Sequence, residues 1–481
     1  MLFNSLLFAI FFPTVVMLYF AIPYRFRWIL LLAASYYFYM CWRAEYIILI
    51  VISTIIDYFA AIKMSETEDK SKRKKFLYLS LFGNLGMLFL FKYYNFFNTS
   101  ISSVFNQFNI FYNSPSFKLL LPVGISFYTF QTLSYTIEVY RGNQKPERHF
   151  GIFALYVSFF PQLVAGPIER STNLLPQFYR KNDFDYNRVK HGLMQMAWGF
   201  FKKLVIADRL GAYVNTVYNS PGNYSGIPLI LATYFFAFQI YCDFSGYSDI
   251  AIGASRIMGY DLMKNFNRPY FSKSISEFWS RWHISLSSWF RDYVYISLGG
   301  NRVSKWKWYR NLFITFMISG LWHGANWTFI LWGSLHGFYL IFSIWTKDIR
   351  QKIAEFTRLA EYPTIHKWFK ILVTFHLVLI SWVFFRANSI SDAMTIFSRM
   401  TIFNFENLGS IGNVTKLGVL ISIFVIIIME VIHILQSKMN FYEVLIKKSL
   451  LFRWSIYSIF VFLIILLGDF GGKVDFIYFQ F

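Results

Sequence analysis

Two histidines lie in a long uncharged segment of the chain. Residues 311–346 contain no Asp, Glu, Lys or Arg, but they include His323 and His336. A neutral imidazole can take a proton from a hydroxyl near physiological pH, so both are candidates for general-base chemistry. An ionisable side chain deep in a membrane segment usually marks a functional site. A neutral histidine that only forms hydrogen bonds within a helix bundle remains the alternative, above all for His336.

The length of this segment predicts how it must fold. One helix of 36 residues would be about 54 Å long, whereas the apolar core of a bilayer is about 30 Å thick. Both flanks are basic, so we expect the segment to fold back at residues 324–327, Gly-Ala-Asn-Trp. His323 then lies roughly 20 Å along the helix from Arg310. On an unbroken helix His323 and His336 would point about 220° apart, so we do not expect a simple dyad.

A second cluster, residues 277–293, alternates charged groups and a histidine with large aromatic residues. Its cationic members Arg281 and Arg291 could bind the phosphate groups of a donor molecule by charge-assisted hydrogen bonds. His283 lies between these two arginines. An aromatic belt at the membrane interface, with arginines that extend toward water, is the alternative interpretation.

A third cluster places two carboxylates, Asp243 and Asp249, within an otherwise apolar stretch. Buried carboxylates need partners, and we expect these to pair with the basic inner loops. The alternative is that they line a conduit.

Several common catalytic motifs are absent from the sequence. It has no Gly-x-x-x-x-Gly-Lys-[Ser/Thr] loop, no Gly-x-Ser-x-Gly elbow and no His-Glu-x-x-His motif, which argues against ATP-driven pumping, a serine-hydrolase elbow and a zincin site. The two cysteines, Cys41 and Cys242, are too few for a disulfide framework or a cysteine metal cluster. We therefore expect no metal and no tightly bound cofactor, and any chemistry rests on histidine.

The composition is that of a membrane protein. Of 481 residues, 56% are hydrophobic, 22% are aromatic and only 15% are charged, whereas soluble domains carry about 25% charged residues. The net charge of +21 comes from basic residues in short loops between apolar runs, which is the positive-inside pattern and not a sign of nucleic-acid binding. We predict an all-α polytopic protein with about 10–12 spans, together with re-entrant and interfacial helices around a central tunnel.

The basic loop 63–75 should face the cytoplasm, and it sets the orientation of the remaining chain. This threading places both termini outside the cytoplasm, in a cytoplasmic (inner) membrane. No Lys or Arg precedes Arg25, so we expect the N-terminal apolar run to be a retained span and not a signal peptide. We expect one domain, 1–481. Within it we predict an Asn/Ser-rich stretch outside the cytoplasm at 98–118, a re-entrant segment at 150–166, cytoplasmic-side interfacial helices at 251–310, a catalytic helix segment at 311–346 and an extracytoplasmic tail at 471–481. The remaining spans are expected at 2–22, 28–43, 44–62, 76–97, 119–140, 191–215, 227–250, 371–385, 417–436 and 454–468.

Four motifs in order resemble the membrane-bound O-acyltransferase (MBOAT) family, in particular its bacterial branch typified by the alginate O-acetylation membrane protein. They are residues 160–168 (Phe-Pro-Gln-Leu-Val-Ala-Gly-Pro-Ile), residues 241–249, Trp282-His283, and residues 320–324 (Gly-Leu-Trp-His-Gly). The resemblance implies that His323 is the catalytic histidine. It also implies that His283 is a second functional residue on the cytoplasmic side.

The last six residues, 476–481, resemble a Phe-x-Tyr-x-x-Phe tail of the same branch. The resemblance implies that the hydroxyl of Tyr478 accepts the acyl group. An aromatic anchor at the membrane interface is the alternative.

The implied function is transfer of an acetyl group from cytoplasmic acetyl-CoA across the membrane, for O-acetylation of an extracytoplasmic polysaccharide such as an alginate-like exopolysaccharide or peptidoglycan. The resemblance also implies an extracytoplasmic acetyltransferase partner of the SGNH type. D-alanyl transfer to teichoic acid and a non-catalytic polysaccharide or lipid transporter are the alternatives.

Overall fold

The computed structural model describes residues 1–112, 114–117, 120–402, 411–412, 414–439, 441–469 and 476–477. Across these residues the regular structure is helical, apart from one isolated bridge between Ile411 and Val414. The all-α class expected from the sequence is confirmed. The chain forms two compact units, residues 1–196 with 250–263 and residues 197–249 with 264–481.

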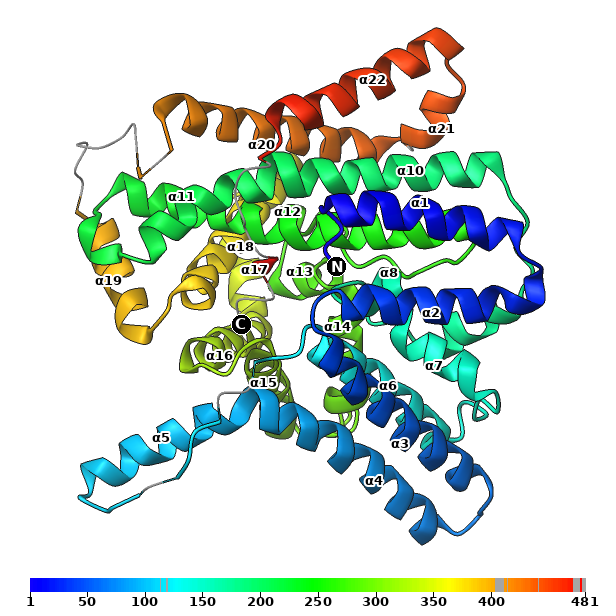
Figure 1. Cartoon of the computed structure of the whole chain (residues 1–481). Coiled ribbons are helices and arrows are strands. Elements are labelled where there is room, and N and C mark those ends of the chain that lie inside the picture. Colours follow the sequence, from blue (N-terminus) through cyan, green and yellow to red (C-terminus); the bar gives the residue numbers. More distant parts are fainter. Residues whose placement is uncertain are drawn as a thin grey trace. The chain divides into compact units, whose positions relative to one another are not determined.

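The first unit contains the N-terminal helices, labelled in Figure 1. Helices α3 and α4 lie side by side, and a buried polar cluster joins them: Asp57 of α3 accepts hydrogen bonds from Ser80 Oγ at 2.5 Å and Asn84 Nδ2 at 2.9 Å, both on α4. The elements are α1 (Leu6–Ala21), η1 (Tyr24–Phe26), α2 (Arg27–Met40), η2 (Ala44–Tyr46), α3 (Ile47–Ser65), α4 (Lys70–Leu88), η3 (Phe89–Tyr93), α5 (Tyr94–Gln107), α6 (Ile125–Arg141), α7 (Phe150–Ser158), α8 (Phe160–Leu163), α9 (Ser171–Leu174), η4 (Leu175–Tyr179) and most of α10 (Tyr186–Phe200).

The second unit contains all of the predicted site residues that the structure describes. Helix α12 (Ile227–Met258) belongs to it as far as Asp249. Its other elements are η5 (Phe201–Ala207), α11 (Asp208–Tyr218), η6 (Pro221–Asn223), η7 (Pro269–Phe271), α13 (Ile275–Arg281), α14 (Ile284–Phe290), η8 (Arg291–Tyr295), α15 (Lys305–His323), α16 (Trp327–Trp345), α17 (Lys347–Phe356), η9 (Leu359–Glu361), α18 (Pro363–Arg386), α19 (Ile390–Met400), α20 (Lys416–Lys438), α21 (Phe441–Ile446) and α22 (Leu450–Leu467).

Seven helices in the described part of the chain are long and apolar enough to cross a membrane. They run over Ala44–Ser65, Lys70–Gln107, Ile227–Met258, Trp327–Trp345, Pro363–Arg386, Lys416–Lys438 and Leu450–Leu467. The polytopic membrane class is confirmed. Other expected spans, such as those at α1, α2 and α6, are helical but shorter than 18 residues, so the count of 10–12 stays a prediction.

The location of the stretch 98–118 outside the cytoplasm stays a prediction, and helix α5 extends into this stretch as far as Gln107. Its hydroxyl side chains bond back to the preceding turn, for example Thr99 Oγ1 to the carbonyl of Asn95 at 2.9 Å and Ser103 Oγ to that of Thr99 at 2.9 Å. Polar residues of this kind are therefore accommodated within a helix. In the expected re-entrant segment 150–166, the chain forms two short buried helices, α7 and α8.

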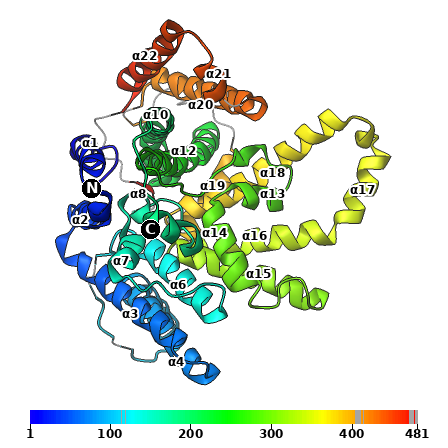
Figure 2. The ribbon, with the colours of Figure 1, turned by 90° about the vertical axis from the view of Figure 1, so that its right-hand side faces the viewer.

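The predicted fold-back of residues 311–346 is confirmed. Helix α15 ends at His323 and α16 begins at Trp327, with the Asn326 side chain capping the new helix by accepting from Thr328 N at 3.0 Å. The two helices lie side by side (Figure 2). They approach so closely that a Cβ added to Gly320 would collide with the carbonyl of Phe329.

Replacing Gly320 with alanine tests this close approach. We expect Gly320→Ala to lower the free energy of unfolding by roughly 1–3 kcal/mol, because the backbone of α16 cannot move aside without repacking. Gly86→Ala on α4 is the matched control, since nothing lies within 4 Å of the added methyl group. Thermal unfolding of the detergent-solubilised proteins, followed by tryptophan fluorescence, measures both. Equal unfolding temperatures for the two variants would contradict the close packing of the hairpin.

Candidate active site

His323 is the last residue of α15 and is buried, with 2% of its surface exposed. Its imidazole lies among aromatic rings from three helices. The ring centroid is 4.8 Å from Trp332 on α16, 5.0 Å from Trp322 and 5.4 Å from Phe385 on α18. At the helix break that directly follows it, His323 is thus surrounded by aromatic side chains of the second unit.

His336 lies on α16, and both of its ring nitrogens are hydrogen-bonded. Trp279 Nε1 donates to His336 Nδ1 at 3.2 Å, and His336 Nε2 lies 2.9 Å from Ser381 Oγ. Because the Ser381 hydroxyl donates its proton to the carbonyl of Val378 at 2.7 Å, Nε2 must be the donor to Ser381. His336 is therefore held as the neutral Nε2–H tautomer, which suits a structural role joining α13, α16 and α18.

The two histidines of this segment share one neighbour. Trp332 lies 4.8 Å from His323 and 5.1 Å from His336, measured between ring centroids. The expected angle of about 220° applied to an unbroken helix. The hairpin instead carries both imidazoles to the same indole.

His283 lies between α13 and α14 and is completely buried. It has a left-handed backbone conformation, with φ of 42° and ψ of 55°, and it directly precedes α14. This conformation is uncommon for a residue other than glycine, and such strain tends to occur at functional sites. The imidazole packs edge-on against Phe244 of α12 at 4.5 Å.

Asn265 fixes which nitrogen of His283 carries the proton. The backbone N–H of Ser285 can only donate, and it points at Asn265 Oδ1 at 3.2 Å, which identifies that atom as the oxygen. His283 Nδ1 lies 3.2 Å from the same oxygen, so Nδ1 must donate. Burial lowers the pKa of His283 to about 3. The imidazole is therefore neutral, with its lone pair on Nε2.

Trp322 is close to both predicted functional histidines. Its ring centroid is 6.2 Å from His283 and 5.0 Å from His323. Forty residues separate these histidines in the sequence, and the structure brings them to the same indole from different elements. A buried pair of imidazoles around one aromatic ring is an arrangement suited to proton transfer and to positioning a polar substrate in an apolar site.

The carboxylates of α12 are paired, although not with the basic loops expected from the sequence. Asp249 Oδ2 lies 2.6 Å from Lys202 Nζ, and Asp243 Oδ1 lies 2.8 Å from Lys203 Nζ. Lys203 Nζ also lies 2.8 Å from Asp208 Oδ1. Both lysines belong to η5, a π-helical segment, and π-helical turns are frequent at functional sites.

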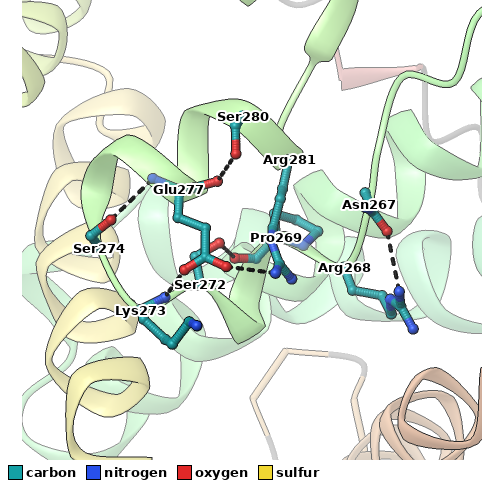
Figure 3. A network of polar contacts seen from close by, with 9 residues as sticks. All are labelled: Asn267, Arg268, Pro269, Ser272, Lys273, Ser274, Glu277, Ser280 and Arg281. Carbon is teal, nitrogen blue, oxygen red and sulfur yellow. Dashed lines mark hydrogen bonds and ion pairs between the residues drawn. The ribbon is translucent and has the colours of Figure 1, made fainter. Parts of the chain in front are cut away.

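The two cluster arginines are engaged by neighbouring carboxylates. Figure 3 shows Glu277 accepting hydrogen bonds from Arg281 Nη2 at 2.6 Å and from Lys273 N at 2.8 Å, while Ser274 caps α13. Arg291 Nε lies 2.8 Å from Asp292 Oδ1, and its side chain is 64% exposed. An ion pair with so exposed an arginine is weak, so a phosphate group can compete for the Arg291 guanidinium group. The Arg281 side chain is less exposed, at 27%.

Of the expected tail, the structure describes only Phe476 and Ile477, and both are buried. The Ile477 backbone N–H donates to Asp243 Oδ2 at 2.9 Å. Tyr478 lies outside the described residues. Among the residues that are described, no group of three or more His, Cys, Asp or Glu could hold a metal ion.

Comparison with known proteins gives consistent matches. Residues 149–385 match the model of the MBOAT, membrane-bound O-acyltransferase family. A probable alginate O-acetylase from Pseudomonas aeruginosa is 40% identical over 402 residues, covering 82% of this chain and 74% of that protein. A peptidoglycan O-acetyltransferase from Helicobacter pylori is 36% identical, with 76% and 72% covered. A teichoic acid D-alanyltransferase from Streptococcus thermophilus is 32% identical, with 56% and 69% covered.

Sequence reasoning missed four residues that organise this site. Lys202 and Lys203 could have been found, because two lysines within an apolar run need buried partners and two carboxylates were available in the next span. Asn265 and Trp322 gave no such signal. Their importance depends on contacts with His283, which lies 18 positions from Asn265 and 39 positions from Trp322 along the chain.

The hydrogen bonds of His336 predict a stability effect. His336→Leu should remove the partner of both the Trp279 indole and Ser381 in a buried site, at a cost of roughly 1–3 kcal/mol for each group left unsatisfied. His376→Leu is the matched control, because His376 is an exposed histidine on α18 that bonds Tyr234 at 2.7 Å. Thermal unfolding in detergent is the measurement. A His336→Leu protein as stable as the His376→Leu protein would exclude the structural role.

Proposed function

We propose a specific activity for this protein, which belongs to the membrane-bound O-acyltransferase family. It transfers an acetyl group from cytoplasmic acetyl-CoA for O-acetylation of an extracytoplasmic polysaccharide. The chain is a multi-pass membrane O-acyltransferase. The observation that carries the finer proposal is the burial of His323 and His283 around Trp322. The alginate and peptidoglycan O-acetyltransferases among its relatives support acetyl as the group transferred.

In the proposed reaction His323 is the general base. It takes the proton of an acceptor hydroxyl as the oxygen attacks the thioester carbonyl, which forms a C–O bond and a tetrahedral intermediate. Collapse of that intermediate breaks the C–S bond, and the imidazolium gives the proton to the leaving CoA sulfur. The aromatic surroundings of His323 exclude water, which would otherwise compete as the acceptor.

His283 orients the donor thioester in this proposal. Its Nδ1 donates to Asn265, so the lone pair is on Nε2, which accepts from an amide N–H of the CoA arm and so positions the attached thioester. Arg281 and Arg291 bind the phosphate groups of CoA by charge-assisted hydrogen bonds. No tightly bound cofactor is required.

We further propose that Tyr478 accepts the acetyl group before it reaches the polysaccharide. Its neighbour Ile477 is bonded to Asp243 of α12, and Phe244, the next residue on that helix, contacts His283. This places the start of the tail within the same cluster of side chains as the candidate site. An extracytoplasmic SGNH-type partner then moves the acetyl group from the tyrosine ester to the polymer.

The proposed transfer across the bilayer requires a particular topology. We propose a cytoplasmic (inner) membrane location with both termini outside, and a tunnel between the two sides within one functional domain, residues 1–481. The interfacial segment 251–310, the catalytic segment 311–346 and the tail 471–481 belong to this domain. The basic loops support this orientation by the positive-inside rule.

D-alanyl transfer to teichoic acid is the second candidate function. The resemblance to the D-alanyltransferase from Streptococcus thermophilus supports it, although over a smaller part of the chain than the O-acetyltransferase matches. Supplying purified protein in vesicles with either acetyl-CoA or a D-alanyl thioester, and measuring the thiol released, separates the two donors.

His323→Ala tests the general-base proposal. We expect CoA release and polymer acetylation to fall at least a hundredfold, because general-base catalysis contributes about 10²–10⁴-fold. Membrane abundance of the variant, measured by immunoblot, should match that of the parent protein. Acetylation within threefold of the parent rate at equal abundance would remove His323 from the mechanism.

Asn265→Asp tests the neutral state of His283 through the pH profile. The new carboxylate favours the charged imidazolium and raises the pKa of His283, so Nε2 loses its lone pair at a higher pH than before. We therefore expect the acidic limb of the rate profile to move to higher pH.

The matched control for this change is Asn267→Asp. Asn267 Oδ1 accepts from Lys264 at 3.2 Å and from Arg268 at 3.4 Å, so a carboxylate there is accommodated without contact to His283. Acetyl-CoA turnover between pH 5 and 9 gives both profiles. Coincident acidic limbs in the two variants would show that the protonation of His283 does not limit the reaction.

A further inference from the structure

A carboxylate and two aromatic rings on α12 hold the start of the C-terminal tail. Asp243 Oδ2 accepts the backbone N–H of Ile477 at 2.9 Å. The ring of Phe476 lies 4.9 Å from that of Tyr247 and 5.9 Å from that of Phe244. Phe476 and Ile477 are each only 1% exposed. Residues 243, 244 and 247, which we call the tail seat, thus contact both a backbone amide and the aromatic side chain that precedes it.

The two oxygens of Asp243 have different partners. Oδ1 lies 2.8 Å from Lys203 Nζ, while Oδ2 accepts from the tail. Lys203 is itself shared with Asp208 at 2.8 Å. If the tail leaves, Asp243 keeps its ion pair with Lys203, and no buried charge is left without a counter-charge. Tail binding and release therefore change one hydrogen bond and the burial of Phe476 and Ile477, while the ion pairs of the helices persist.

The seat is continuous with the candidate active site. Phe244 contacts Phe476 and also packs edge-on against His283 at 4.5 Å. A tail held by Asp243 is thus fixed in position beside the residues that surround His283. Tyr478 is the residue after Ile477 in the sequence.

We propose that the tail seat is a reversible docking site for the chain's own C-terminal segment, and that Asp243 is the positioning residue that presents this segment for acyl transfer. Lys203 keeps the seat charged between cycles. The presentation step rests on the proposed function, because it requires an acceptor in the tail, whereas docking itself does not. The competing interpretation is that the contact only packs the end of the chain.

Asp243→Asn is the decisive substitution because it conserves volume. The single amide oxygen that remains will face the charged Lys203, so the NH2 group faces the Ile477 N–H and two donors oppose each other. Asp249→Asn is the matched control on the same helix. Asp249 pairs with Lys202 at 2.6 Å, and asparagine keeps an oxygen for that lysine.

Docking is measured with a cysteine reporter. In a Cys41→Ser background, which removes the exposed native thiol, Ile477→Cys places a thiol at a buried tail position. We expect a polyethylene-glycol maleimide to label this thiol at least tenfold faster in Asp243→Asn than in the parent, and at the parent rate in Asp249→Asn. Equal labelling of Asp243→Asn and the parent, at equal unfolding temperature, would overturn the docking site.

Presentation is measured separately by kinetics. With Ile477 restored, Asp243→Asn should lower kcat for acetyl-CoA at least tenfold with an unchanged KM, since the donor side is intact. If Asp243→Asn speeds labelling of the tail but leaves kcat normal, the contact only packs the end of the chain, and Asp243 has no positioning role. Tyr478→Phe separates failure of the proposed function from failure of the docking site. If that variant acetylates polymer normally, Tyr478 is not the acceptor. The labelling result still decides whether the tail docks.

Discussion

Burial of charge within an apolar interior is the constraint on which this site depends. A lysine or carboxylate left alone in such surroundings is strongly destabilising, and the cost falls only when opposite charges meet in good geometry. Lys203 meets this condition through Asp208 and Asp243, and Lys202 through Asp249. These contacts fix the lengthwise position of α12 against η5. The close approach also requires Gly246, since a Cβ there would lie 2.8 Å from the carbonyl of Gly199.

Two neighbouring rows of side chains on α12 make different contacts. Residues four apart lie on one face of a helix. Asp243 and Tyr247 form one row, which contacts the tail. Phe244 and Ser248 form the next, where Phe244 packs on His283 and Ser248 Oγ accepts from the Asn265 amide at 3.3 Å. The spacing of these four residues thus lets one helix contact both the tail and a histidine.

The sequence predicted those features that follow from local chemistry. The length of the uncharged segment, together with Gly324 and Asn326, predicted the hairpin of α15 and α16, because a helix that long does not fit a bilayer. The motifs predicted the family. The lysine partners of the carboxylates were predicted wrongly, because the positive-inside rule describes loops and does not address lysines within a span. The proximity of His283 to Trp322 was not predictable from one sequence, since it depends on how α13, α14 and α15 pack.

Three of the buried histidines in the second unit, His283, His323 and His336, show how hydrogen bonding separates chemical from structural roles. All three are surrounded by aromatic rings, so burial alone does not distinguish them. His336 uses both nitrogens, one to accept from Trp279 and one to donate to Ser381, and it cannot take a proton without losing the first bond. His283 is held through Nδ1 by Asn265, which directs its lone pair to Nε2. The high aromatic content serves this arrangement, because indole and phenyl rings pack around imidazoles without adding charge. A neutral imidazole in such surroundings retains the lone pair that acyl transfer requires.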